Sequence, residues 1–428
     1  MTASRHRWSV VAIFFFFMLI HQADRLVISS LTPDIIETFH ITDGEMGRVA
    51  SGALIVGAIF YPLWGYLYDR YARPKLTALA SFIWGATTWL NAIAPNYGTF
   101  FVTRATTGID DSSYPGLYSL ISDYFGPLVR GKVYGLLQLT MPLGYLAGMG
   151  LAMGLGGVIG WRAIFYITGS LGILMSVLIF FGVHDVPRGK SEPELAGLEQ
   201  IGVYRFDWQT AKELFRKPSL RLLFAQGFFG VFPWNVIVAW FFTYLERERG
   251  YSGGTLYITM AVAVLVLAAG YPIGGAAGDW LFKRTPRGRA IVSSAAVLLG
   301  AILMLLTLSV PTANQPLFMV MLALTALFIP FASPNVVSTV YDVTLPEVRS
   351  TAMSIQYFIE SAGAALAPWI AGEISDRSSL HNAILIICIS TWVLCSILFA
   401  IVAFLVPRDI ATLHSQMQAR AEYEQARQ

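Results

Sequence analysis

Apolar stretches of about 20 residues recur along the whole chain, with short polar segments between them. A helix of about 20 apolar residues is long enough to cross the roughly 30 Å hydrocarbon core of a bilayer. The pattern predicts an all-α membrane protein with twelve transmembrane helices. The predicted spans are residues 8–32, 46–68, 75–95, 97–121, 131–157, 162–183, 219–245, 254–280, 288–310, 316–341, 349–372 and 382–406.

The composition agrees with a chain that lies mostly in lipid. Of the 428 residues, 55% are hydrophobic and 13% are charged, against about 25% charged in soluble domains. The first apolar run is too long for a signal peptide, contains Asp24 and Arg25, and precedes no small-residue cleavage site. Cys388 and Cys395 form no metal or disulfide pattern. Because no phosphate loop, metal cluster or catalytic triad is visible, we expect no enzyme, no metal and no cofactor.

The basic residues predict the orientation. With the N-terminus in the cytoplasm, 22 of the 29 Lys and Arg residues fall in cytoplasmic segments and five in outer loops. This excess predicts a multi-pass protein of the cell inner membrane with both termini inside. The net charge of +3 then reflects topology, and no nucleic-acid partner is expected.

The two halves of the chain repeat each other. Tyr61-Pro62-x-x-Gly65-x-x-x-Asp69 recurs 210 residues later as Tyr271-Pro272-x-x-Gly275-x-x-x-Asp279. Two six-span halves in the same orientation predict a transporter with its site between them. At an offset of 219, Pro115, Asp123, Pro127, Arg130 and Gly144 match Pro334, Asp342, Pro346, Arg349 and Gly363.

The repeat divides the chain into four parts. We expect pseudo-symmetric six-helix bundles at 1–183 and 219–407, a cytoplasmic linker at 184–218, and a tail at 408–428. The linker carries an amphipathic segment, 208–215, predicted to run along the membrane surface. It is either a tether between the halves or a regulatory element.

Five charged residues interrupt apolar runs. A charge near the bilayer centre costs several kcal/mol, so such residues usually pair and mark an ion or substrate path. We interpret the mixture of acids and bases as a proton pathway; a static ion-pair cluster that fixes helix packing is the alternative. The five are Asp24, Arg25, Arg104, Asp110 and Asp111.

Helix spacing suggests how these charges meet. Arg104 and Asp111 share a helix face, whereas Asp110 lies about 100° away. Glu360 lies near the middle of the eleventh span and shares a face with Tyr357. Glu360 is a second candidate for protonation or for substrate binding, or a packing residue with a hydroxyl neighbour.

The segment Gly65-Tyr66-Leu67-Tyr68-Asp69-Arg70-Tyr71-Ala72-Arg73 resembles the G-x-L-x-D-R-x-x-R signature of the major facilitator superfamily. We expect a conformational latch there, with Gly65 allowing close helix contact and Asp69 at the positive end of a neighbouring helix. In proteins of this fold, spans 1, 4, 7 and 10 line the cavity, which would let Asp24 and Arg25 meet Arg104 and Asp111. The predicted gating residues are Gly65, Asp69, Arg70, Arg73, Asp279 and Arg130.

A narrower resemblance is to Spinster-like transporters. Asp24-Arg25 followed by Pro33-Asp34-Ile35 is similar to the start of that family, and Arg104-x-x-x-Gly108-Ile109-Asp110-Asp111-Ser112-Ser113-Tyr114 is similar to its fourth span. The family's Asn-Tyr is His21-Gln22 here, its glutamate is Asp111 and its glycine is Asp110. The resemblance implies an amphiphilic lipid substrate and proton coupling.

The sequence thus predicts a proton-coupled secondary transporter of a small amphiphilic or lipid-like substrate such as a lysophospholipid, working in the bilayer as a monomer. The alternatives are an organic-anion symporter of the anion:cation type, for carboxylates or sugar acids, and a non-transporting receptor or structural membrane protein. Proton coupling is assigned to Asp24, Asp111, Asp110 and Glu360. Substrate binding is assigned to Arg25, Arg104, His21, Tyr114, Phe232, Trp234 and Tyr357.

Overall fold

The computed structural model describes residues 2–195, 208–251 and 253–426, and within these residues the regular structure is helical throughout. Short 3₁₀ helices lie at Pro193–Leu195, Leu214–Arg216, Ile329–Phe331 and Pro346–Val348. The α-helices are α1 Thr2–Phe39, α2 Asp43–Arg70, α3 Arg73–Ile93, α4 Tyr97–Thr106, α5 Gly108–Asp111, α6 Tyr114–Tyr124, α7 Arg130–Gln138, α8 Thr140–Gly182, α9 Trp208–Glu213, α10 Pro218–Arg247, α11 Gly253–Phe282, α12 Gly288–Ser309, α13 Gln315–Phe328, α14 Ala332–Asp342, α15 Arg349–Arg377 and α16 Leu380–Gln425.

Each of the twelve predicted spans corresponds to a helical segment. The fourth span is α4, α5 and α6 in series, the tenth is α13 and α14, and the fifth and sixth share α7 and α8, divided at Gly160 by a non-helical backbone. By length and composition alone, eight helices of the described chain are apolar enough to cross a membrane. The second, fourth, fifth and eleventh predicted spans are not among these eight, and the fourth is divided among α4, α5 and α6.

Local sequence explains several helix starts. Thr42 caps α2 by accepting from the Glu45 N–H at 3.2 Å, and the Glu45 carboxylate accepts from the Thr42 N–H at 2.9 Å, a reciprocal capping box. Asn96 caps α4 through the Thr99 N–H at 2.9 Å. These caps satisfy orphan donors at turns that short loops impose.

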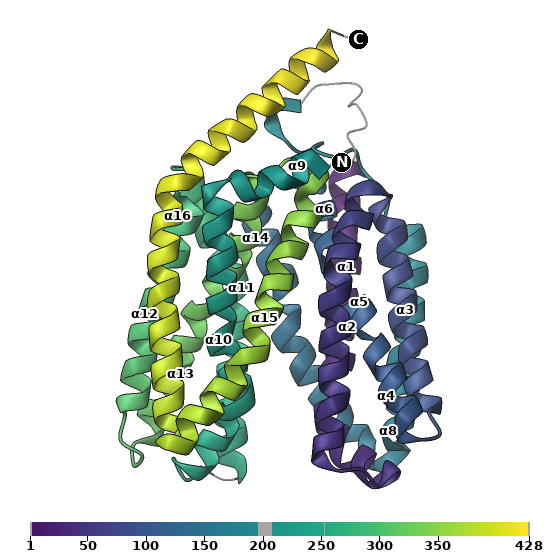
Figure 1. Cartoon of the computed structure of the whole chain (residues 1–428), viewed down its shortest axis with the longest axis vertical. Helices are drawn as coiled ribbons and strands as arrows, with labels where there is room; N and C mark the ends of the chain where they lie inside the picture. Colours follow the sequence, from purple (N-terminus) through teal and green to yellow (C-terminus); the bar gives the residue numbers. More distant parts are fainter. Residues whose placement is uncertain (1, 196–207, 252, 427–428) are drawn as a thin grey trace.

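Two bundles lie side by side (Figure 1). In the first, α1 and α3 pack along α8; in the second, α10 packs on α15 and α16, and α12 packs on α16. Between the bundles, α2 contacts α15 and α7 contacts α11. The bundles meet at the end where both termini and α9 lie and diverge toward the opposite end (Figure 1). We call the meeting end, formed by the last turns of α2 and α11 and the first turns of α7 and α15, the closed end.

Glycines permit the close contact there. A Cβ on Gly65 would lie 2.6 Å from the Ser354 Oγ on α15, and a Cβ on Gly275 would lie 2.0 Å from the Gly131 carbonyl oxygen on α7. Gly65 and Gly275 are equivalent positions in the repeat, so the same small-residue contact occurs twice. The expectation that Gly65 permits close helix contact is confirmed.

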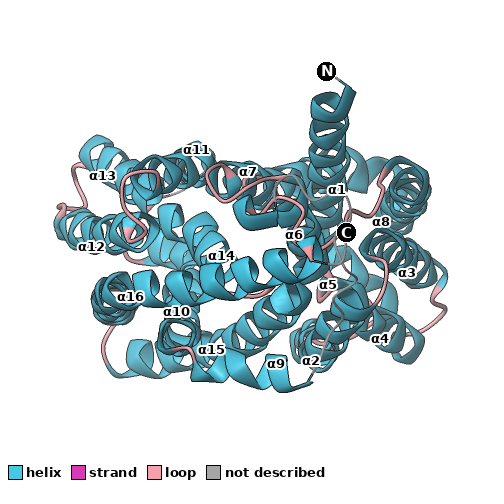
Figure 2. Cartoon of the chain, turned by 90° about the horizontal axis from the view of Figure 1, so that it is seen from above, coloured by secondary structure: helices cyan, strands magenta, loops and turns pink. Residues whose placement is uncertain are grey.

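The described parts of the linker, 184–195 and 208–218, and the tail lie over the closed end, and Figure 2 views the two bundles and α9 from that side. The predicted amphipathic segment is helical from Trp208 to Glu213, with a 3₁₀ turn to Arg216. The last span and the tail form one continuous helix, α16, which passes through Pro407.

Candidate functional site

A cavity of about 690 Å³ lies between the two bundles. Its walls combine apolar side chains with polar groups from both halves, as ligand sites usually do. The polar and aromatic lining includes Gln22, Arg25, Tyr61, Asp111, Tyr114, Gln138, Gln226, Trp234, Asn235, Tyr357 and Glu360.

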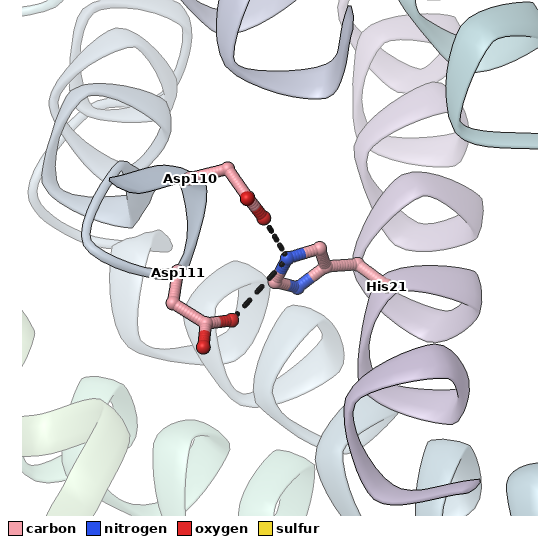
Figure 3. A group of neighbouring side chains, drawn as sticks. All are labelled: His21, Asp110 and Asp111. Atoms are coloured by element: carbon pink, nitrogen blue, oxygen red, sulfur yellow. Dashed lines mark hydrogen bonds and ion pairs between the residues drawn. The ribbon is translucent and has the colours of Figure 1, made fainter. Parts of the chain in front are cut away.

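Behind one wall of the cavity, a histidine faces two carboxylates (Figure 3). His21 Nε2 lies 2.8 Å from Asp110 Oδ2 and 3.4 Å from Asp111 Oδ1. The other ring nitrogen, Nδ1, lies 2.5 Å from the Tyr114 hydroxyl. His21 and Asp110 are each 3% exposed, whereas Asp111 is 18% exposed and lines the cavity. The imidazole therefore connects a cavity-facing acid to a buried one.

A break in the fourth span brings both acids to His21. On either side of the short helix α5, the Thr107 hydroxyl donates to the Arg104 carbonyl at 2.7 Å, and the Ser112 hydroxyl donates to the Ile109 carbonyl at 2.9 Å. Such bonds compete with regular helix hydrogen bonding. In the structure, Asp110 and Asp111 therefore converge on one ring, although an unbroken helix would separate them.

Arg25 extends this cluster into the cavity. Its Nε lies 3.7 Å from Asp111 Oδ2, and its side chain is 37% exposed. Gln22 donates to the Tyr114 hydroxyl at 3.2 Å. With a neutral imidazole, two aspartates and one arginine carry one net negative charge, so one added proton makes the cluster neutral. The three ligand atoms of His21, Asp110 and Asp111 lie within 4.8 Å of one another, which could also suit a metal ion, but the adjacent guanidinium disfavours a second cation.

Asp24 lies elsewhere. It accepts hydrogen bonds from Trp84 Nε1 at 2.9 Å, from the Thr88 hydroxyl at 3.2 Å and from the Thr168 hydroxyl, all within the first bundle. The expectation that Asp24 meets Arg104 and Asp111 is wrong, because neighbouring helix residues point about 100° apart and Arg25 takes the cavity side. These contacts give Asp24 the surroundings of a structural carboxylate.

Arg104 also stays out of the cavity lining. It is buried, and its Nη2 lies 3.4 Å from the backbone oxygen of Arg25. No ion pair between Arg104 and Asp111 is present in the described residues, since the break after Thr106 changes the direction of the fourth span.

The second bundle contributes Glu360, Tyr357 and Trp234 to the cavity, as expected. Glu360 accepts from Gln356 at 2.7 Å, and the Tyr357 ring stands 5.6 Å from the Tyr61 ring of the first bundle. Phe232 does not line the cavity and packs on Phe228 instead. The sequence analysis missed Tyr61, Gln138, Gln226 and Asn235, whose signal was a polar side chain inside an apolar run.

The closed end is held by helix capping across the bundles. Asp69 accepts from the backbone N–H groups of Ser350 and Thr351 on α15, at 3.1 and 2.7 Å. Asp279 accepts from Gly131 and Lys132 on α7, at 3.1 and 2.8 Å. A carboxylate at a helix N-terminus is stabilised by free N–H groups and the helix dipole. The predicted position of Asp69 is confirmed, and Asp279 repeats it.

Buried arginines surround these caps. Arg73 pairs with Asp123 and, at 3.0 Å, with Asp185. Arg130 pairs with Glu192 at 2.6 Å. Arg70 is exposed and donates a hydrogen bond to the Tyr66 hydroxyl one turn away, so it lies beside the ion-pair network of the buried arginines.

Two related helical bundles that meet at one end around a charged central cavity define a membrane transport protein. The chain belongs to the Major Facilitator Superfamily, whose model matches residues 13–368 and 287–423. It is an integral, multi-pass membrane protein.

Among curated proteins the chain is similar to Protein spinster of Drosophila melanogaster, with 29% identity over 89% of this chain and 64% of that protein. The chain thus spans less than two thirds of that relative. Protein spinster homolog 1 of Homo sapiens is 25% identical, over 86% of this chain and 73% of that protein. A Probable L-galactonate transporter of Escherichia coli (strain K12) is also 25% identical, over 90% of this chain and 86% of the relative.

Solved structures share the fold. The human organic anion transporter MFSD10 (TETRAN) superposes with a TM-score of 0.70 at 16% identity, over 94% of this chain and 99% of that one. A bacterial homolog of the human lysosomal transporter Spinster, in an inward-facing and unoccupied conformation, gives a TM-score of 0.56 at 20% identity, over 95% and 98%.

Proposed function

We propose that this protein is a proton-coupled secondary transporter of small amphiphilic organic anions and works by alternating access. The observation that carries the proposal is the cluster of His21, Asp110, Asp111 and Arg25 at the wall of the cavity. Buried ionisable residues in membrane proteins are costly, and they are retained where they bind or move charge.

The proton would enter from the cavity at Asp111 and pass through His21 to Asp110. Only Asp111 of these three lines the cavity, and the ring nitrogen shared by both acids is within 3.4 Å of each. An anionic substrate at Arg25 would draw this guanidinium from Asp111 and leave the acids to take a proton. This order of events couples anion binding to protonation, so that the anion and the proton move in the same direction, as symport requires. Glu360, on the opposite bundle, is a second group that can hold a proton within the same cavity.

The alternating movement would use the closed end as a gate. With both termini in the cytoplasm of a cell with an inner membrane, the closed end is cytoplasmic and the cavity opens outward. The pairs Asp69 with α15 and Asp279 with α7 would then break when the cavity opens inward. Gly65, Arg73 and Arg130 take part through the close contact and ion pairs already described.

An apolar part of the substrate has a place at one edge of the cavity. The helices α2 and α15, which contact each other between the bundles, carry three apolar residues that line the cavity and are also exposed: Leu54, Ile55 and Phe358. An exposed apolar edge next to a charged interior suits a molecule with an anionic head and an apolar tail. The similarity to Spinster proteins agrees with this substrate class.

A sugar acid is the second candidate. Gln22, Gln138, Gln226 and Asn235 offer amide groups that match hydroxyls along a short chain, and Arg25 would bind its carboxylate. The similarity to an L-galactonate transporter favours this alternative.

Uptake into proteoliposomes under an imposed pH gradient tests both candidates, with a lysophospholipid and a six-carbon sugar acid as substrates. We expect pH-driven uptake of one of them, lost in Asp111→Asn and His21→Gln and kept in Asp34→Asn, an exposed aspartate on the same helix as His21. Full pH-driven uptake in both cluster variants would contradict proton coupling through this site. Absence of uptake across a broad panel would revive a receptor role.

A further inference from the structure

A glutamate of the linker is buried between the two bundles. Glu192 lies in the turn Gly189–Leu195, yet its side chain is only 6% exposed. Its Oε1 accepts from Arg130 Nη2 at 2.6 Å and from Arg349 Nη2 at 2.5 Å. Both guanidiniums are completely buried. A connecting segment with no other task than tethering has no need of a carboxylate in such a place.

The two arginines are equivalent residues of the repeat. Arg130 begins α7 of the first bundle, and Arg349 begins α15 of the second. These are the same two helix starts that Asp279 and Asp69 cap from the opposite bundle. Glu192 therefore binds both members of a symmetric pair with one oxygen atom.

The turn itself is fastened to the first bundle. The Gly189 N–H donates to Asp123 Oδ1 at 2.8 Å, and the Ser191 hydroxyl donates to the Asp123 backbone oxygen at 2.5 Å. Next to it, Glu194 pairs with His414 of α16. The turn thus contacts both bundles, through Asp123 of the first and through His414 of the second. Opening the closed end would therefore separate Glu192 from either Arg130 or Arg349.

Charge balance depends on this carboxylate. Without Glu192, the carboxylate nearest to Arg130 is Asp342 at 3.7 Å, and that nearest to Arg349 is Asp123 at 3.5 Å. Both distances exceed those of good charge-assisted hydrogen bonds. A buried guanidinium that loses its close partner is strongly destabilising, and here the loss would fall on the closed arrangement.

We propose that Glu192 is a gating residue that fastens the closed end by bridging Arg130 and Arg349, so that the linker is a working part of the gate. The proposal rests on the alternating-access part of the proposed function and on no particular substrate or ion.

Pulsed dipolar electron paramagnetic resonance on the full-length protein tests it. Spin labels at Lys75→Cys and Lys283→Cys, exposed positions at the closed end of each bundle, measure the separation, with the buried Cys388 and Cys395 replaced by alanine. We expect Glu192→Gln to lower the ratio of short to long distances about tenfold or more. Glu192→Asp, whose shorter side chain cannot hold both arginines equally, should give an intermediate ratio.

Glu194→Gln is the matched control, because it removes a neighbouring carboxylate that pairs with neither arginine. Its partner His414 is 50% exposed, so that ion pair contributes little and the ratio should stay close to the wild-type value. A folded Glu192→Gln variant with an unchanged ratio would overturn the proposal. If that variant does not fold, Glu192→Asp decides by the same criterion. Since the readout is a distance, a failure of the proposed substrate or of proton coupling would not move it.

Discussion

Asp69 and Asp279 occupy equivalent positions in the two bundles, and each caps the first turn of a helix that belongs to the other bundle. The closed end is thus held by two copies of one interaction. Each copy combines a carboxylate with backbone N–H donors at a helix start.

Replacing either aspartate should loosen the closed end to a similar degree. Asp69→Asn and Asp279→Asn keep the shape but remove the charge, at a cost of about 1 kcal/mol each. We expect the ratio of short to long spin-label distances to fall about fivefold in each variant and further in the double variant. If one variant has no effect while the other abolishes the closed form, the two aspartate caps do not stabilise the closed end equally, and this prediction is wrong.

Charge removal in the His21 cluster should uncouple transport. In Asp111→Asn and His21→Gln, proton transfer between Asp111 and Asp110 is interrupted, so pH-driven uptake should fall at least about tenfold. Exchange of labelled for unlabelled substrate, which needs no net proton movement, should persist. Equal losses in both assays would indicate damage to binding instead.

Asp24 should behave differently from Asp111. In Asp24→Asn, the new amide places a donor among Trp84, Thr88 and Thr168, which already donate to this position. An unmatched buried donor costs about 1–3 kcal/mol, so the thermal midpoint should fall while the folded fraction keeps pH-driven uptake. Loss of pH-driven uptake at normal stability would return Asp24 to the proton pathway.

The ion pairs of Glu192 predict a dependence of stability on pH. Burial alone would favour the neutral acid, but the guanidiniums of Arg130 and Arg349 outweigh it and lower the pKa of Glu192 to about 2. The ionised carboxylate therefore stabilises the folded state fully above about pH 4.5, and this contribution, on the order of 3 kcal/mol, is lost as the pH falls toward 2.

Thermal unfolding of the wild type and of Glu192→Gln from pH 6 to pH 3 isolates this contribution, because other carboxylates titrate in both. The wild type should be more stable at pH 6, and the difference should shrink as the pH falls below about 4.5. A difference that is constant with pH would exclude a lowered pKa at Glu192.

Gly189 gives the linker turn its shape. Its φ of 78° lies in the left-handed region, and an added Cβ would meet Leu195 and Pro346, each at 3.1 Å. Gly189→Ala should destabilise this turn by about 1–2 kcal/mol. The distances between the spin labels at the closed end should therefore shift toward longer values. Gly254→Ala, where a Cβ on helix α11 meets no atom within 4 Å, is the control and should be neutral or slightly stabilising.

The architecture followed from the sequence because twelve apolar runs and one repeat leave few alternatives. The position of Asp69 at a helix start also followed, since the repeat and the signature segment place it at the end of a span. These features depend on spacing within one helix and on the order of helices along the chain.

The site followed only in part. The prediction that Arg104 and Asp111 share a helix face assumed an unbroken fourth span. In the structure this span is broken where the hydroxyls of Thr107 and Ser112 donate to backbone carbonyls. Asp24 and Arg25 are neighbours in sequence but point to different surroundings, which only the packing against Trp84 and Thr168 decides. Glu192 had no sequence signal, because a single glutamate in a polar linker is ordinarily solvated.

The uninterrupted course of α16 has a mechanical consequence. Its 46 residues span about 70 Å, from the far end of the second bundle, through the closed end, to the C-terminal tail. Arg420 on this tail pairs with Glu347 of the same bundle, which braces the projecting part. The tail is therefore a lever arm of the second bundle. A rotation of this bundle by a few degrees at the cavity becomes a displacement of several ångström at Gln425. A single fluorophore attached there, beyond the bilayer, would report each turnover.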